Sequence, residues 1–327
     1  MGIQIEAAPI LDGETDAIAI ETQNLSKCYG RTKAVSDLQM VVKKGAICGF
    51  LGPNGAGKTT TIRLLLGLSR PTSGRFLLFG REATGQPRLI ASTVVALFED
   101  SPAYPYLTGS EMLHVACLAA HQKTDRSRLL AALDRFGLGP AGERRVGTYS
   151  QGMRQRLGLA IVHILDRRIV VLDEPMNGLD PQGQADFRRH LMDLQGEGRT
   201  IVFSSHLLHD VEETCSHLVI LNRGRLVAEG TTGSLLATQR QRIVARPEPI
   251  VKAVAMHYPS LTMETSEGAE VVLDCPSSIA SNLAAALVVG GAEILRFEER
   301  RSSLSTLFLE LTAESRKDAD IAESPPR

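Results

Sequence analysis

The stretch GPNGAGKTT, residues 52–60, decides the fold because it sets three glycines and a proline beside a lysine and two threonines. It lies between the apolar run AICGFL, which predicts a strand, and the segment TIRLLLGL, which predicts a helix. The spacing Gly-x-x-x-x-Gly-Lys-Thr is typical of a P-loop, whose backbone N–H groups and helix dipole bind phosphate. A flexible turn without a ligand is the alternative, and the two flanks favour phosphate binding. The expected binding residues are Gly52, Pro53, Asn54, Gly55, Ala56, Gly57, Lys58, Thr59 and Thr60.

Two carboxylates further along the chain complete a hydrolytic pattern. The apolar run IVVL leads directly into Asp173 and Glu174. A buried strand that ends there would deliver both side chains to the edge of the sheet where a P-loop also lies. In that arrangement Lys58 would reach the β- and γ-phosphates, and the Thr59 hydroxyl and Asp173 would hold Mg²⁺, Asp173 through water. Glu174 would orient or deprotonate the attacking water, whereas a solvated acidic strand end is the alternative reading.

Composition narrows the class of protein. The 327 residues suit one large domain and a smaller one. The net charge of -1 does not indicate a nucleic-acid partner. Five scattered cysteines without a C-x-x-C pair favour reduced thiols in a cytosolic protein. No basic residue precedes Lys27, so a secretory signal is not expected, and no apolar run is long enough to span a bilayer.

The order of apolar runs predicts an α/β domain with a largely parallel sheet. Apolar strands such as AICGFL, TVVALFE and RTIVFSS alternate with amphipathic helices such as PQGQADFRRHLMDLQ. A capping box, Thr108 to Glu111, predicts a helix that begins near residue 109. After about Arg240 the runs VVLDCP and AEILRFEE suggest strands around a helix, followed by a final helix in SSLSTLFLEL. We expect a flexible leader at 1–15, the main domain at 16–240, a small α+β module at 241–313 and a disordered tail at 314–327.

Three more motifs accompany the P-loop and the acidic pair. YSQGMRQRLGLA (149–160) precedes the pair, and NGLDPQG (177–183) and FSSH (203–206) follow it. In this order, over roughly residues 16–235, the motifs resemble those of the ATP-binding subunits of ABC transporters. The resemblance implies a P-loop ATPase head with a helical subdomain inserted at about residues 100–165. It also implies ATP and Mg²⁺ as ligands.

The same resemblance implies a role for the segment that contains Ser150, Gln151 and Gly152. These residues match the signature motif LSGGQ, which binds the γ-phosphate of an ATP held by the opposite subunit. Two subunits would therefore close head-to-tail around two ATP molecules. A serine hydroxyl and backbone amides at a helix amino end form a suitable anion site.

Three single residues also match positions of known role in the family. His206 matches the switch histidine, which contacts the γ-phosphate and the catalytic glutamate, although a lone histidine is more often structural. Asp180 matches the D-loop, which crosses the dimer interface. Tyr29 in KCYG matches the aromatic residue that stacks on adenine, and a turn packing residue is the alternative there.

Several residues depart from the family pattern. The signature has Tyr149 for Leu, Gln151 for the first Gly and Met153 for Gln. Glu99 stands where the family has a glutamine that reaches Mg²⁺ and faces the membrane subunit. A carboxylate binds a hard cation more strongly than an amide does but repels the γ-phosphate. We therefore expect Glu99 to change how ATP binding is coupled to transport without abolishing it.

The segment around Glu99 and the run LDEPMNGLDPQG are similar to the bacitracin-resistance and lantibiotic-immunity branch of exporters. The resemblance implies a peripheral subunit on the cytoplasmic face of the membrane. It would pair with a second copy of itself and energise a separate membrane permease for antibiotic peptides, drugs or lipids. A soluble ABC ATPase of DNA repair or of ribosomes is the rival, but no long coiled coil or second P-loop is seen. An ordinary P-loop kinase or GTPase is disfavoured by YSQGM and SSH, and the cargo, its direction and the composition of the dimer stay open.

Overall fold

The computed structural model describes residues 17–98, 104–205, 207–258, 260–265, 270–301, 303–309 and 311–312. The predictions for Glu99, His206, the leader and the tail lie outside these ranges. The chain forms two compact units, the main part of the first ending at Thr232 and the second spanning Gly233–Glu310. The predicted boundary, after residue 240, lies inside a strand of the second unit. In the described ranges, none of the helices has the length and apolar character required to cross a bilayer.

The first unit contains an antiparallel sheet that the sequence analysis did not anticipate. Its strand order is β2-β1-β4-β5. A turn of only two residues, Gly30 and Arg31, joins the first two strands, and Gly30 adopts a φ of 58°. So short a connection forces antiparallel pairing, because a parallel pair needs a long crossover. The strands are β1 (Ile18–Tyr29), β2 (Thr32–Lys43), β4 (Ser73–Leu78) and β5 (Arg81–Glu82).

The second sheet of this unit is the predicted, largely parallel one. Its order is β10-β9-β3-β8-β7-β6, and only the edge strand β10 runs antiparallel to its neighbour. The strands are β3 (Ile47–Leu51), β6 (Val94–Phe98), β7 (Ile169–Asp173), β8 (Thr200–Ser204), β9 (His217–Asn222) and β10 (Arg225–Thr231). The helices that flank the two sheets are α1 (Lys58–Leu65), α2 (Pro87–Thr93), α6 (Pro181–Gly196) and α7 (Leu208–Thr214).

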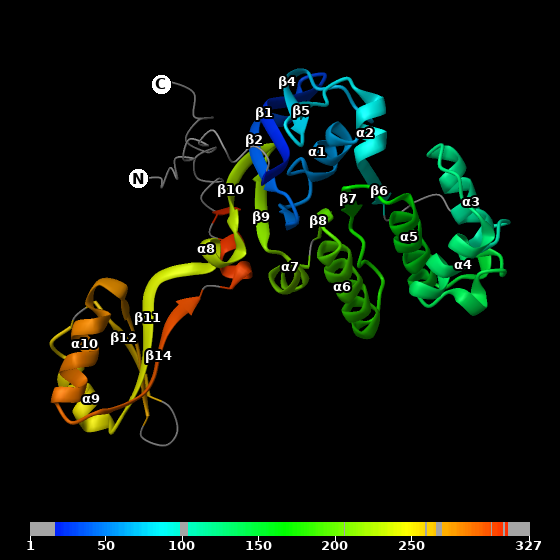
Figure 1. Cartoon of the computed structure of the whole chain (residues 1–327). Coiled ribbons are helices and arrows are strands. Elements are labelled where there is room, and N and C mark those ends of the chain that lie inside the picture. Colours follow the sequence, from blue (N-terminus) through cyan, green and yellow to red (C-terminus); the bar gives the residue numbers. More distant parts are fainter. Residues whose placement is uncertain are drawn as a thin grey trace. The chain divides into compact units, whose positions relative to one another are not determined.

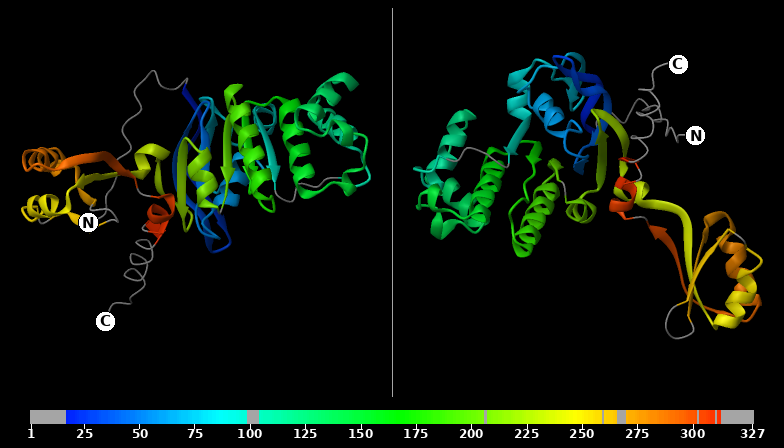
Figure 2. Two further views of the ribbon diagram at one scale, coloured as in Figure 1. Left: turned by 90° about the horizontal axis from the view of Figure 1, so that it is seen from below. Right: turned by 180° about the vertical axis from the view of Figure 1, so that it is seen from behind.

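Alternate residues of the central strand face different helices. In β3, Cys48 and Phe50 belong to the core cluster that also contains residues of α1 and of the antiparallel sheet. Gly49 points the other way, since a Cβ there would lie 2.6 Å from Cγ1 of Val211 in α7. Helices α1 and α7 therefore cover opposite faces of the parallel sheet, and α6 lies with α7 in Figures 1 and 2. This layering holds the carboxyl end of β3, and with it the P-loop, at the edge of the sheet.

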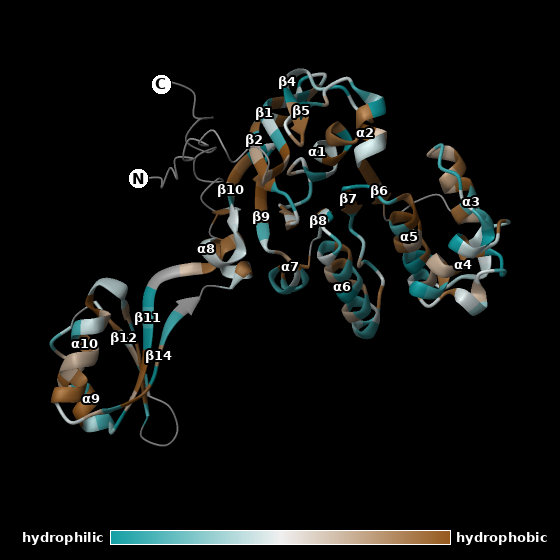
Figure 3. Cartoon of the chain, viewed as in Figure 1, coloured by the Kyte–Doolittle hydropathy of each residue, from teal (hydrophilic) through white to brown (hydrophobic). Residues whose placement is uncertain are grey.

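A helical segment is inserted between β6 and β7. It consists of α3 (Gly109–Ala119), α4 (Arg126–Arg135), two short 3-10 turns (Gly139–Ala141 and Val146–Thr148) and α5 (Gln151–Leu165). The predicted capping box is confirmed, because Thr108 accepts from the backbone of Glu111 and the Glu111 carboxylate accepts from that of Thr108. The carboxyl half of α5 is apolar (Figure 3) and packs on β6, where Gly158 meets Leu97.

The second unit is richer in structure than the sequence suggested. After α8 (Thr232–Leu236) come β11 (Ala237–Arg246), α9 (Glu248–Ala255), β12 (Thr262–Thr265), β13 (Val271–Pro276), α10 (Ser277–Val289) and β14 (Glu293–Arg301). The strand order is β12-β13-β11-β14 with antiparallel neighbours. A β-α-β-β-α-β chain in this order is the ferredoxin-like arrangement. Both helices pack on the sheet through one apolar cluster that includes Ile243, Val251, Leu273 and Leu283.

Candidate functional site

Two glycines of the P-loop lie where no other residue fits. Gly52 follows the fully buried β3 with a φ of 154°, and a Cβ on it would lie 2.4 Å from the carbonyl oxygen of Leu221. Gly57 caps α1 with a φ of 103°, and a Cβ on it would lie 2.6 Å from the carbonyl oxygen of Ala34. Both combine close contact with a backbone conformation that side chains disfavour. The loop is therefore held between β9 and β2, with Pro53, Asn54 and Gly55 exposed.

The amino end of α1 has the electrostatic character of an anion site. Its first turn contains no acidic residue and its cap has no side-chain hydrogen bond. The Lys58 ammonium donates to the carbonyl oxygens of Gly52 at 2.5 Å and Pro53 at 3.3 Å, so it lies over the loop. Burial lowers the pKa of Lys58, and the charges of Glu174 and Asp173 oppose this shift. The lysine and the two carboxylates therefore lie close enough to interact electrostatically.

The acidic pair is fixed by a residue that the sequence analysis quoted but gave no role. Ser204, at the end of β8, is completely buried and lies between β3 and β7 in the sheet. Its hydroxyl donates to Asp173 Oδ1 at 2.6 Å and accepts from the Glu174 backbone N–H at 3.0 Å. Glu174 itself has a φ of 50°, an unusual conformation for a residue with a side chain. One hydroxyl therefore holds both carboxylate residues at the edge beside the P-loop.

We predict that Ser204→Ala destabilises the protein by about 1–3 kcal/mol, because it removes a buried donor and acceptor at once. ATP hydrolysis per folded molecule should also fall, since Asp173 and Glu174 lose their shared partner. Urea unfolding and steady-state hydrolysis measure the two effects. Ser205→Ala is the matched control, because Ser205 Oγ accepts only from the Leu207 backbone among the bonds described for it. Equal losses in the two variants would contradict this role of Ser204.

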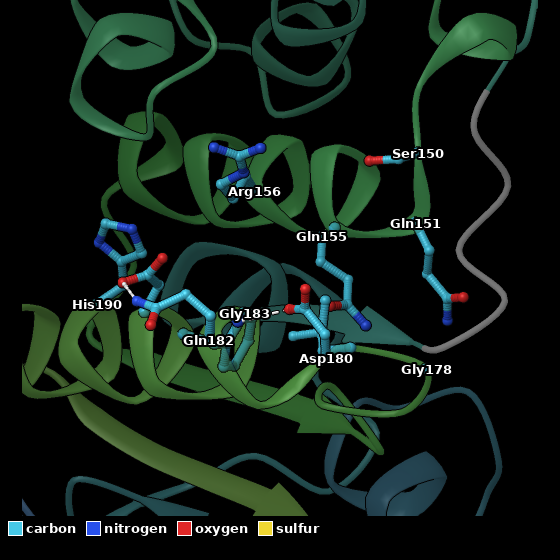
Figure 4. A pocket seen from close by; sticks show the side chains of 13 residues that line it. Ser150, Gln151, Gln155, Arg156, Gly178, Asp180, Gln182, Gly183 and His190 are labelled. Carbon is cyan, nitrogen blue, oxygen red and sulfur yellow. Dashed lines mark hydrogen bonds between the residues drawn. The ribbon is translucent and has the colours of Figure 1, made fainter.

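A cavity of about 460 Å³ separates the signature segment from the start of α6 (Figure 4). Ser150 caps α5 and accepts from the Met153 backbone at 3.3 Å, and Asp180 caps α6 and accepts from the Gly183 backbone at 2.8 Å. The predicted signature and D-loop residues therefore line one hollow. No P-loop residue is among the described residues that line it. The complete lining is Ser150, Gln151, Gly152, Gln155, Arg156, Gly178, Leu179, Asp180, Gln182, Gly183, Asp186, Phe187 and His190.

The first departure in the signature has a clear structural role. Tyr149 is buried, and its hydroxyl donates to the Ala141 carbonyl at 2.7 Å. Burial raises the pKa of this phenol. A Cβ at Gly109 would lie 2.5 Å from the Tyr149 hydroxyl, so the start of α3 is shaped to admit the ring. The tyrosine ties the start of α5 to the rest of the helical segment and leaves Ser150 as the cap.

Tyr29 lies on the hairpin that supports the P-loop. The residue is 50% exposed, and the Lys27 ammonium lies 5.0 Å from the ring centre. On the following strand, the carbonyl oxygen of Ala34 lies so close to Gly57 and Gly224 that a Cβ on either glycine would clash with it. An exposed aromatic ring on this hairpin is available for stacking.

The residues predicted to hold Mg²⁺ are compatible with that ion. Thr59 is exposed on the first turn of α1, and Asp173 is half-buried at the end of β7. Within the described ranges, no group of three or more His, Cys, Asp and Glu side chains could hold a metal alone. Mg²⁺ needs no such group, because it is commonly bound through one or two carboxylates together with substrate phosphates. The donor set suits an ion that arrives with a nucleotide.

The chain is similar to a protein family, to two relatives of known class and to a solved structure. A family model described as ABC transporter matches residues 35–177. The bacitracin transport ATP-binding protein BcrA of Bacillus licheniformis is 33% identical over 298 residues, covering 89% of this chain and 96% of BcrA. The daunorubicin/doxorubicin resistance ATP-binding protein DrrA of Streptomyces peucetius is 32% identical over 321 residues, covering 94% of this chain and 96% of DrrA.

A solved structure of the ATP-binding subunit of an ABC transporter is 29% identical, with a TM-score of 0.61. It covers 66% of this chain and 91% of its own. The predicted α/β fold of the first unit is thereby confirmed. BcrA and DrrA are matched over 89% and 94% of the chain, whereas the solved structure is matched over 66% of it.

Proposed function

Because the chain belongs to the ATP-binding subunits of ABC transporters, we propose that the P-loop and the acidic pair form its ATP-hydrolysing site. The observation that carries this proposal is the Ser204 hydroxyl, which fixes Asp173 and Glu174 at the end of β7. Only β8 separates this strand from β3, which leads into the P-loop. The glycines of residues 52–57 leave room for phosphate oxygens near the backbone, and the amino end of α1 attracts them. A transport role is favoured over that of a soluble ATPase, because the transport and drug-resistance relatives match both units.

In this proposal each residue of the site has a distinct role. Lys58 leaves its two loop carbonyls and binds the β- and γ-phosphates, while the first-turn amides of α1 bind oxygens beside them. Glu174 orients a water molecule toward the γ-phosphate and accepts its proton. Mg²⁺, held by Thr59 and by Asp173 through water, would neutralise phosphate charge when it is bound. Tyr29 stacks on the adenine.

His206 and Glu99 enter the proposal through the family pattern. His206 follows Ser204 and Ser205 in the sequence. The strand β8, which ends at Ser204, pairs with the strand that ends at Asp173. We propose that it contacts the γ-phosphate and Glu174. We propose that Glu99, one residue past β6, contributes to the Mg²⁺ site and alters the coupling to the membrane subunit.

The signature segment acts on a second subunit in this proposal. Ser150, Gln151 and Gly152 line a hollow with the D-loop and without the P-loop, so an ATP-binding partner is required to complete the site. The simplest partner is a second copy of this chain, because one chain carries all the motifs. ATP would favour the closed dimer and hydrolysis would reopen it, which is a population shift between two states.

We further propose that the dimer sits on the cytoplasmic face of the membrane and drives a separate permease as an exporter. The named relatives support cargo of the antibiotic and drug classes, since they are a bacitracin transport protein and a daunorubicin/doxorubicin resistance protein. Lipids remain within this class of amphipathic cargo. No nucleic-acid partner is proposed, because the net charge is only -1.

Affinity purification tests the proposed assembly. The tagged full-length chain is isolated from gently solubilised membranes, and co-purifying proteins are identified and quantified by mass spectrometry. We expect one polytopic membrane protein, or a fixed pair of them, in stoichiometric amount. The same tag on Ser150→Ala should recover that partner equally well, since the change affects the ATP-dimer contact. Recovery of ribosomes or DNA in place of a membrane protein would contradict the transport assignment and favour the soluble class.

A further inference from the structure

Two glutamine amides converge on a single backbone atom beside the candidate catalytic residues. Gln151 Nε2 donates to the carbonyl oxygen of Asn177 at 2.8 Å, and Gln155 Nε2 donates to the same oxygen at 3.2 Å. The two glutamines are four residues apart on α5, so they lie on one face of the helix. Figure 4 shows both side chains leaving α5 on the side of the loop that carries Gly178 and Asp180. The amino end of α5, which begins within the signature segment, is thus hydrogen-bonded to the loop that follows Glu174.

The loop is shaped to receive the Gln151 amide. Gly178 adopts a φ of 68°, and a Cβ there would lie 2.5 Å from both Nε2 and Oε1 of Gln151. Any other residue at this position would displace the amide as well as strain the backbone. On the next residue, Leu179 Cδ2 lies 3.4 Å from the Cβ position of Gly152. The contact therefore involves complementary surfaces on both elements.

Hydrogen bonds continue from this contact to the carboxylate residue. The Asn177 N–H donates to the Glu174 carbonyl oxygen at 3.3 Å, and the Glu174 N–H donates to Ser204. Met176, which lies between Glu174 and Asn177 in the sequence, is only 2% exposed and anchors the loop in the core. A displacement of Asn177 would consequently be transmitted to the backbone of Glu174. At the other end, Ser150 caps the same helix that carries the two glutamines.

We infer that Gln151 and Gln155 are positioning residues that couple phosphate binding at Ser150 to the placement of Glu174. This inference rests on the proposed function. Gln151 stands where the family pattern has a glycine, which could not make this bond, so the coupling contact at that position belongs to this chain. When the signature segment engages the phosphate of a partner's ATP, the movement of α5 is carried through the Asn177 carbonyl into the loop. Because both amides donate to the Asn177 carbonyl oxygen, we expect this contact to affect turnover more than nucleotide binding.

Gln151→Glu is the sharpest test, because it keeps the shape and replaces the donor Nε2 with an acceptor that repels the Asn177 carbonyl. We expect kcat for ATP hydrolysis by the full-length chain to fall by about ten-fold, the usual worth of one such bond, while KM changes less than about two-fold. Amide hydrogen exchange in the peptide covering residues 175–180 should accelerate. Gln151→Gly, which adds no charge, should change both measurements in the same direction to a smaller extent. Gln195→Glu makes the same chemical change outside the cavity, where Gln195 Nε2 donates to the Gly45 carbonyl oxygen at 2.8 Å, and should leave kcat unchanged.

A kcat within about two-fold of the parent value in both Gln151 variants would overturn the inference. So would a loss of kcat matched by an equal loss in Gln195→Glu, or one explained by a lower melting temperature. Glu174→Gln separates this failure from a failure of the proposed function. If Glu174→Gln is inactive and Gln151→Glu is normal, only the coupling is wrong. If Glu174→Gln hydrolyses ATP normally, the assignment of the catalytic site is wrong.

Discussion

Replacement of Glu174 by glutamine is expected to reduce ATP turnover by at least about a hundred-fold, the range of a lost general base. The change keeps the side chain's size and its backbone bond to Ser204, which involves the N–H and not the carboxylate. It removes the only group in the proposal that accepts the proton of the attacking water. Nucleotide binding should be preserved, because the carboxylate that is lost would repel the γ-phosphate. The variant should therefore accumulate in an ATP-bound closed dimer.

Two measurements check this prediction. Phosphate release at saturating ATP gives the turnover, and light scattering after size-exclusion chromatography with ATP and Mg²⁺ gives the mass of the complex. Glu82→Gln is the matched control, since Glu82 lies exposed on β5 and pairs only with Arg75 among the contacts described for it. The control should hydrolyse ATP normally and should not accumulate as an ATP-bound dimer. Turnover at the parent rate in Glu174→Gln would remove that residue from its proposed role.

The P-loop and the acidic pair could be found from the sequence because each is a contiguous motif. The functional residues of each motif are neighbours in the sequence. The apolar run before each motif predicts the strand that carries it. Ser204 could not be assigned in the same way. Its contacts with Asp173 and Glu174 depend on the parallel register of β7 and β8, which sequence spacing does not specify. A hydroxyl residue directly after the apolar run TIVF was the available signal.

The strand pairing of the first unit and the first strand of the second unit could not be predicted from the sequence. The strand β11 was missed because its sequence, ATQRQRIVAR, contains three arginines and two glutamines, so the run looks polar when read as a whole. In the structure Ile243 and Ala245 of that strand enter the core. The antiparallel sheet of the first unit was missed for a different reason. Apolar content identifies a strand, but its neighbour follows from the connection, here a turn of two residues between β1 and β2.

Replacement of Lys58 by methionine is expected to weaken ATP binding by about ten- to a hundred-fold, because a charge-assisted contact with phosphate is lost. The stability of the nucleotide-free protein should change much less. Burial lowers the pKa of Lys58, which means that the charged form is partly desolvated in the fold, and an apolar chain of similar length avoids that cost. The lost hydrogen bonds to Gly52 and Pro53 act in the opposite direction. The two effects on the unliganded protein therefore partly cancel, whereas the effect on binding has no compensation.

Thermal unfolding with and without ATP and Mg²⁺ separates these two quantities. A ligand that binds only the folded state raises the melting temperature in proportion to the logarithm of its concentration over Kd. We expect this rise to be much smaller in Lys58→Met at ATP concentrations that just saturate the parent, while the melting temperature without nucleotide stays close to that of the parent. Lys43→Met removes an equal charge from an exposed position at the end of β2 and should keep the full rise. If Lys58→Met is stabilised by ATP as strongly as the control, the phosphates do not bind at residues 52–60. If instead the unliganded variant unfolds at a much lower temperature, the lysine acts mainly as a structural clamp on the loop.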